Sequence, residues 1–207
     1  VRESFKPQFD VPITIAPGQN NIKTDVDRLK PAVPGFITRF SPNLVYADSH
    51  RVPRVDVIHL HHGVWLTNSQ LTFAAGEEKT ILQLPRGYGL PYAPSDAWLL
   101  NYMIHNLTPN PTSVYIKYDI DFLPDSEPAA QSLIPVHPLW MDVAGIAAYP
   151  VFDAYQGTGT KGRFTFPDQA RGAQRRDIGV AHQWTAPSDV TLVGTAGHLH
   201  PGGLWDD

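Results

Sequence analysis

Proline recurs along this chain at intervals too short for long helices. The 207 residues include 20 prolines and 16 glycines, which divide the chain into short segments. A proline inside a helix removes a backbone hydrogen-bond donor and clashes with the preceding turn. The composition therefore predicts an all-β fold built from short strands and turns.

Alternating apolar and polar side chains support this prediction. Apolar residues occupy every second position between residues 112 and 122, which is typical of a half-buried antiparallel strand. Residues 98–105 alternate in the same way, and the proline-containing turn 108–111 predicts that the two strands form a hairpin. Further strands are expected at residues 11–16, 36–40, 54–66, 143–152, 163–166, 177–185 and 189–200.

A polar stretch bounded by Pro124 and Pro128 indicates a linker near the middle of the chain. We expect an N-terminal domain at residues 1–124, a linker at 125–135 and a C-terminal domain at 136–207. Each domain carries its own group of histidines.

Charge and composition exclude several functional classes. The net charge is −4, and no run of basic residues is longer than Arg175-Arg176, which argues against a nucleic-acid or membrane partner. No apolar stretch reaches the roughly 18 residues of a membrane-spanning helix. The chain begins at Val1 without an initiator methionine or an apolar signal segment, so we expect a processed, secreted protein. Because cysteine is absent, any metal must be held by histidine, methionine or carboxylate.

Five of the nine histidines lie in two short motifs. In an extended strand, residues two apart point to the same face, so His59 and His61 can reach one ion, and so can His198 and His200. His61 and His62 would point to opposite faces unless a bulge near Gly63 turned both toward one site. These spacings permit a metal site in each half of the chain. Surface pairs or hydrogen-bonded core pairs are the alternative interpretation.

His105 is a further candidate ligand, because it lies on the less apolar face of its strand beside Met103. His50, His137 and His182 stand singly and are given no ligand role. Imidazole ligands suit copper, zinc or iron, and a thioether would favour copper.

Together these residues resemble the copper type II ascorbate-dependent monooxygenases, the family of peptidylglycine α-hydroxylating monooxygenase and dopamine β-monooxygenase. The resemblance covers most of residues 54–203. It lies in the adjacent His61-His62, the turn Leu84-Pro85-Arg86-Gly87-Tyr88-Gly89, the strand ending at His105, and the later His198-Leu199-His200.

This resemblance implies two jelly-roll-like β-sandwich domains, the second incomplete in this chain, and two copper sites. His61, His62 and His105 would hold the electron-transfer copper. His198 and His200 would hold the catalytic copper, where dioxygen and a small-molecule or peptide substrate meet. His59 and Met103 are candidates for an alternate ligand or for a side chain that supports a ligand. Ascorbate would be the reductant, and a C–H bond of the substrate would be hydroxylated.

In the family, a methionine on a later strand also binds the catalytic copper, and the only methionines here, Met103 and Met141, are not at that position. We therefore expect a second polypeptide, or a continuation beyond Asp207, to complete the C-terminal domain.

Two other functions remain open. A non-catalytic, secreted copper-binding or carrier protein would keep the sites without turnover. A cupin-like metal-dependent enzyme would also place His-x-His on a jelly-roll strand, but its motif has a glutamate a few residues later, and the first acid after His61 is Glu77.

Overall fold

The computed structural model describes residues 3–5, 11–17, 20–26, 30–77, 79–139 and 185–196. Within this part of the chain the fold is all-β, with one short 3-10 helix, η1 (Pro128–Ser132), as predicted from the proline content. The strands are β1 (Glu3–Phe5), β2 (Ile13–Ile15), β3 (Asn20–Val26), β4 (Gly35–Tyr46), β5 (Ile58–Thr67), β6 (Gln70–Gly76), β7 (Leu82–Gln83), β8 (Tyr88–Tyr92), β9 (Trp98–Asn106), β10 (Thr112–Pro124) and β11 (Ile134–Pro135).

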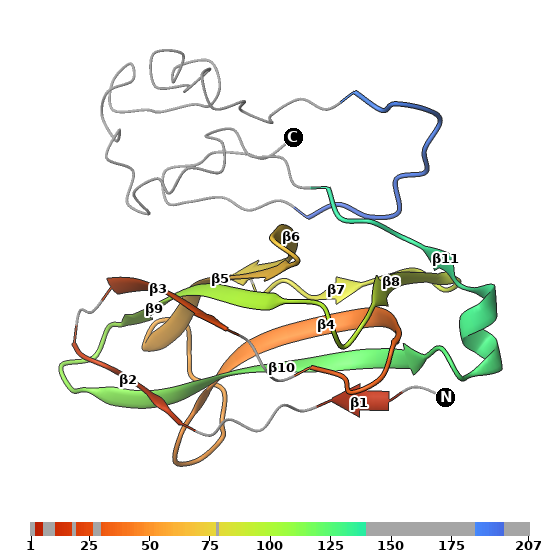
Figure 1. Cartoon of the computed structure of the whole chain (residues 1–207). Coiled ribbons are helices and arrows are strands. Elements are labelled where there is room, and N and C mark those ends of the chain that lie inside the picture. The colour runs from red at the N-terminus through yellow and green to blue at the C-terminus, as the bar shows by residue number, and fades with distance from the viewer. Residues whose placement is uncertain are drawn as a thin grey trace, which may run out of the picture. The chain divides into compact units, whose positions relative to one another are not determined.

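The strands form two sheets that face each other as a β-sandwich. The seven-stranded sheet has the order β1-β10-β4-β8-β11, with β2 paired to β10 and β7 paired to β4. The four-stranded sheet has the order β3-β9-β5-β6. Figure 1 shows β4 and β10 in one layer and β5 and β9 in the other. Pairing is antiparallel except between β11 and β8, which are parallel.

Aromatic side chains fill the space between the two sheets. Phe40 of β4 stacks on Phe73 of β6, with ring centroids 4.1 Å apart, and meets the edge of Trp65 of β5 at 5.0 Å. Every second residue of β10 from Val114 to Phe122 is buried, as the alternation predicted. This apolar core is the main source of stability, because the chain has no disulfides.

The predicted hairpin between residues 98–105 and 112–122 is wrong, although both strands exist. β9 belongs to the four-stranded sheet and β10 to the seven-stranded sheet, so their connection crosses from one layer to the other. The buried side chain of Asn106 holds this crossing: its amide donates to the backbone carbonyls of Ile15 and Asn110, at 3.0 and 2.8 Å. Its side-chain oxygen accepts from the backbone and hydroxyl of Thr108. These bonds replace the ladder that a hairpin would form.

The N-terminal unit extends beyond the expected boundary. The chain divides into two compact units, Val1–Pro138 and Leu139–Asp207. The segment 125–135, expected as a linker, lies in the first unit and contains η1 and β11. The backbone N–H groups of Ile134 and Val136 donate to the carbonyls of Gly87 and Gly89, which ties this segment to β8.

The expected strands of the C-terminal half are only partly covered by the structure. Residues 143–152, 163–166 and 177–184 lie outside the described residues. Residues 189–196, expected within a strand, are described and contain no strand.

Candidate metal centre

The antiparallel pairing of β5 and β9 brings two of the histidines together. His59 of β5 lies directly opposite His105 of β9 in the ladder. Nε2 of His59 is 3.2 Å from Nδ1 of His105. Both residues alternate with core residues of their strands, Ile58 and Leu60 in β5 and Ile104 in β9. The two imidazoles therefore project from the four-stranded sheet on the side away from the core.

A β-bulge at His61 sets which way the next histidines point. The ladder pairs Leu60 with Ile104 and His62 with Met103, so His61 is an extra residue without a direct partner in β9. Leu60 and Trp65 are both in the core, although their odd separation would place them on opposite faces of a regular strand. The bulge resolves this conflict. It turns His59, His61 and His62 to the same face, as the sequence led us to consider.

Glu77 enters the group from the neighbouring strand. β6 ends at Gly76, which pairs with His62, so Glu77 lies beside His61. Its carboxylate oxygen Oε1 accepts a hydrogen bond from Nδ1 of His61 at 2.8 Å and lies 3.1 Å from Nε2 of His59. Sequence reasoning missed this residue as a ligand. The two-residue turn at Asn68 and Ser69 signals the hairpin, but its register alone would place residue 76 opposite residue 61. A register shift between Trp65 and Leu66 brings residue 77 to that position instead.

These four residues form one compact group of donor atoms. One ligand atom from each of His59, His61, Glu77 and His105 lies within 4.8 Å of all the others. The rings of His61 and His105 stack with centroids 4.3 Å apart and planes inclined by 17°. The ring of His59 meets that of His105 edge-on, at 5.0 Å.

A backbone contact fixes the tautomer of His59. Its Nδ1 lies 2.5 Å from the carbonyl oxygen of Val55, and because a carbonyl can only accept, Nδ1 must carry the hydrogen. In the neutral ring, Nε2 then keeps its lone pair and points at His105 and Glu77. This arrangement, with one ring nitrogen bonded to a backbone carbonyl, is typical of histidines that bind metals through the other nitrogen.

The electrostatics of the group suit a cation. Nε2 of His59 and the carboxylate of Glu77 both present electron pairs at 3.1 Å, so either a proton or a metal ion must lie between them. The pKa of His105 is lowered to about 4, mainly by burial and also by positive charge on His61 and His59, while Glu77 opposes the shift. His105 is therefore neutral near pH 7 and has the lone pair that a metal requires.

Glu77 is ionised at the same pH. Burial raises the pKa of this carboxyl, but the hydrogen bond from His61 and the charges of His59, His61 and His105 outweigh burial, so the pKa lies below its usual value. The group thus combines the neutral imidazole of His105 and two further imidazoles with a carboxylate, a donor set that first-row transition metals accept.

The donor spacing fits a metal ion. Bonds of about 2.0–2.2 Å in a tetrahedral site separate neighbouring donors by about 3.4 Å. Three of the donor–donor distances here are 2.8, 3.1 and 3.2 Å, and all donors lie within 4.8 Å of one another, so small side-chain movements would bring them to this spacing.

The group is buried on one side and open on the other. The side chains of His59 and His61 are 9% and 6% exposed, whereas that of Glu77 is 45% exposed. A pocket adjoins the group where β4 faces the ends of β5 and β6, and His59, Glu77, Leu44, Val55 and Lys79 are among the residues that line it. Water can therefore approach from the side of Glu77.

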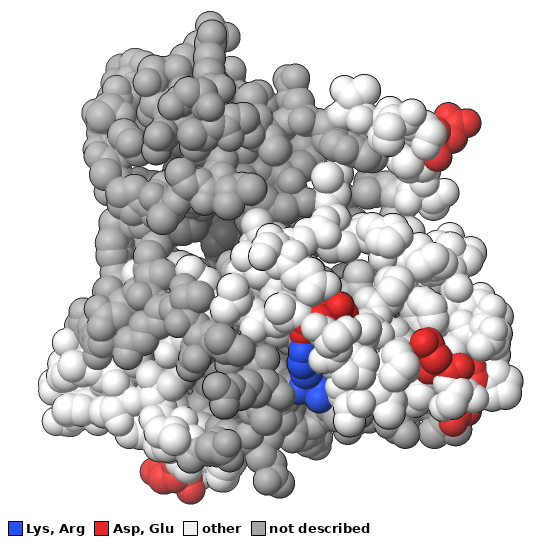
Figure 2. Space-filling view, viewed as in Figure 1, with Lys and Arg blue, Asp and Glu red and all other residues white. Residues whose placement is uncertain are grey.

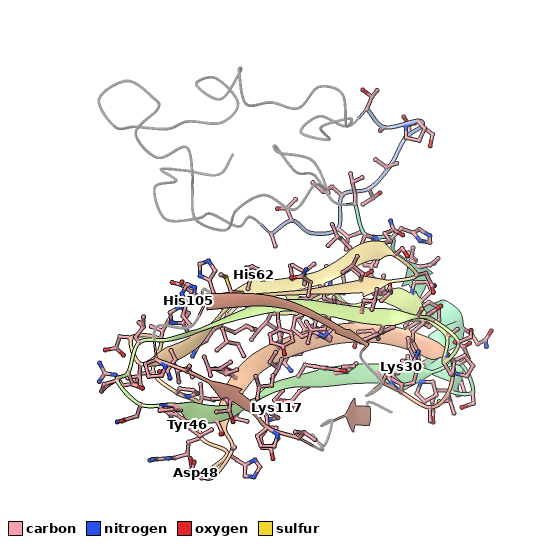
Figure 3. All side chains as sticks on the ribbon, turned by 60° about the vertical axis from the view of Figure 1, so that its left-hand side comes forward. Lys30, Tyr46, Asp48, His62, His105 and Lys117 are labelled. Atoms are coloured by element: carbon pink, nitrogen blue, oxygen red, sulfur yellow. The ribbon has the colours of Figure 1, made fainter. Side chains whose placement is uncertain are left out.

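The predicted ligands are distributed as follows. His61 and His105 lie in the group, joined by His59 and Glu77, while His62 lies outside it, with its ring 5.7 Å from that of His61. Figure 3 shows His62 and His105 near each other at one end of the four-stranded sheet. Met103 lies opposite His62 in the ladder. His198 and His200, predicted to hold a second copper, are outside the described residues.

Figure 2 shows one face of the protein, coloured by charge. On the face shown in Figure 2, most described side chains are uncharged, and basic side chains do not form a stripe. In the part of the chain that the structure describes, no helix is long and apolar enough to cross a membrane.

No protein-family model matches this chain, and no curated protein or solved structure matches it either. The resemblance to copper monooxygenases therefore stays a prediction from its motifs.

Proposed function

We propose that this protein is a metalloenzyme whose N-terminal sandwich binds one transition-metal ion through His59, His61, Glu77 and His105. The observation that carries the proposal is the convergence of these four donors within 4.8 Å, with His59 oriented by the carbonyl of Val55. A pair of surface histidines that binds no metal would be expected neither to be buried nor to contact a carboxylate, whereas His59 and His61 do both.

The chain's own residues would bind and position the ion. His59 and His105 are held by the β5–β9 ladder, and His61 by the bulge, so the three imidazoles are arranged before a metal arrives. Glu77 would balance part of the metal's charge and, as the most exposed of the four, lies where a substrate would approach. When bound, a redox-active ion would supply activation of dioxygen.

For the activity, we propose a copper-dependent monooxygenase that hydroxylates a C–H bond with dioxygen and a reductant such as ascorbate. The motif order from His61 to His200 and the imidazole-rich donor set support this choice. This activity requires a second copper at His198 and His200. A secreted location would suit the loading of copper.

Glu77 favours a second candidate, a cupin-like enzyme with a single metal. The sequence argued against a cupin because no acid closely follows His61. In the structure, the β5–β6 hairpin nevertheless brings Glu77 to His59 and His61. His-x-His, a glutamate and a later histidine on a β-sandwich would hold iron, manganese or zinc as readily as copper.

Metal analysis of the purified full-length chain tests the proposal. Two coppers per chain, of which His105→Ala removes one and His198→Ala the other, would support the monooxygenase. A single metal that His105→Ala abolishes and His198→Ala retains would support the cupin-like enzyme. A protein that binds no transition metal, or that keeps full metal in the His105→Ala variant, would overturn the proposal.

A further inference from the structure

A histidine and a methionine lie side by side next to the proposed metal centre. His62 of β5 and Met103 of β9 are direct partners in the antiparallel ladder, immediately after the bulge at His61. Residues directly opposite each other in such a ladder have Cβ atoms about 4.5–5.5 Å apart, so their side chains can meet at one ion.

Both side chains lie on the face away from the core. In β9, the core residues Tyr102 and Ile104 flank Met103, which therefore points to the opposite side of the sheet. In β5, the bulge at His61 shifts the alternation by one residue. Trp65 therefore lies in the core, and His62, three residues earlier, points to the same side as Met103.

Met103 is unusual for a residue on this face. It is only 2% exposed, although it is absent from the apolar core cluster and its neighbours of the same face in β9, Asn101 and His105, are only half-buried. The thioether is thus shielded from water although it lies outside the apolar cluster between the two sheets. Shielding of this kind favours a soft, weakly hydrated ion over a hard divalent one.

We propose that His62 and Met103 form a separate binding site for monovalent copper, with the imidazole nitrogen and the thioether sulfur as ligands. Thioether sulfur selects Cu(I) among the common biological metals, whereas the carboxylate of Glu77 suits divalent ions. The two sites therefore differ in preference: the thioether site selects Cu(I), whereas the four-residue centre also accepts divalent ions. The Cu(I) site uses none of the four residues of the proposed metal centre. It can therefore be tested separately from that centre.

The test is a Cu(I) titration of the full-length protein under anaerobic, reducing conditions against a chromophoric Cu(I) chelator. Met103→Leu should weaken Cu(I) binding at least tenfold and remove copper–sulfur scattering from the X-ray absorption spectrum. His62→Gln should weaken binding similarly. The leucine substitution conserves volume, and such changes cost little stability, so the variant should fold.

Met141→Leu is the matched control, because Met141 is the only other methionine in the chain. It should leave both the Cu(I) affinity and the copper–sulfur scattering unchanged. Glu77→Gln should weaken the binding of Zn(II) but leave the copper–sulfur scattering unchanged, which separates this site from the four-residue centre. Absence of Cu(I) binding, retention of copper–sulfur scattering in Met103→Leu, or its loss in Met141→Leu would each overturn the proposal.

Discussion

His59 and His105 are direct partners across the β5–β9 ladder, and their facing ring nitrogens are 3.2 Å apart. Both are therefore fixed by the backbone hydrogen bonds of the sheet rather than by a flexible loop. A metal between them would gain from this rigidity, because the two strands are already ordered and the His59 ring is already oriented by the carbonyl of Val55.

Glu77→Gln should weaken divalent metal binding by about 10–100-fold or more, since it removes the only negative charge of the group. Titration calorimetry with Zn(II) on the metal-free protein measures this change. Glu127→Gln, which alters a glutamate outside the group, should retain the affinity of the unmodified protein. Equal affinities for the two variants would show that Glu77 is not a ligand.

His105 should make the metal-free protein less stable as the pH falls from about 6.5 to about 4. Its pKa is about 4 in the folded protein, against an ordinary value of 6.5 in the unfolded chain. Between these values the unfolded chain binds more protons, so the free energy of unfolding decreases as the pH falls. Glu77 also lowers the free energy of unfolding as the pH falls below the ordinary pKa of glutamate. Its pKa is lowered in the folded protein, so the unfolded chain takes up this proton first.

Urea unfolding at a series of pH values, in the presence of a chelator, measures this dependence. His105→Gln should show a shallower decline in the free energy of unfolding between pH 6.5 and 4. A decline as steep as that of the unmodified protein would mean that His105 is not responsible.

Gly35→Ala should destabilise the sandwich by about 2 kcal/mol or more, because overpacking costs of this size are common in rigid sites. A Cβ atom at position 35 would lie 2.3 Å from the backbone oxygen of Leu123 and 2.6 Å from the ring of Phe122. Gly194→Ala is the matched control, since nothing lies within 4 Å of its added Cβ. Thermal unfolding should show a lower midpoint for the first variant only.

Asn106→Leu should cost at least about 2 kcal/mol, because it removes several buried hydrogen bonds and leaves backbone groups of the β9–β10 connection without partners. Asn106 is fully buried and bonds to Ile15, Thr108 and Asn110. Asn110→Ala should have a much smaller effect, because the bond to residue 110 uses its backbone carbonyl. Chemical unfolding of both variants distinguishes these contributions, and equal stabilities would contradict this role of Asn106.

Local patterns predicted the strands better than they predicted how the strands pair. The alternation in residues 112–122 follows from one face of β10 packing against the core, which is a local property of the sequence. The pairing of β10 with β4, rather than with β9, depends on contacts between segments that are far apart in the sequence. The turn at residues 108–111 contains no information on this choice, so the predicted hairpin failed.

For the candidate metal centre, the sequence by itself limited any ligands to histidine, methionine or carboxylate, and it indicated His61, His62 and His105, with His59 as an alternate. Only the tertiary structure showed that His59 and Glu77 lie in one group with His61 and His105, and that His62 pairs with Met103 outside that group. The physical reason is that a metal site depends on three-dimensional distance. Glu77 reaches His61 through the register of one hairpin, and His62 changes face because a single bulged residue shifts the alternation of β5. Both effects depend on the pairing between strands, which short-range patterns of residues do not specify.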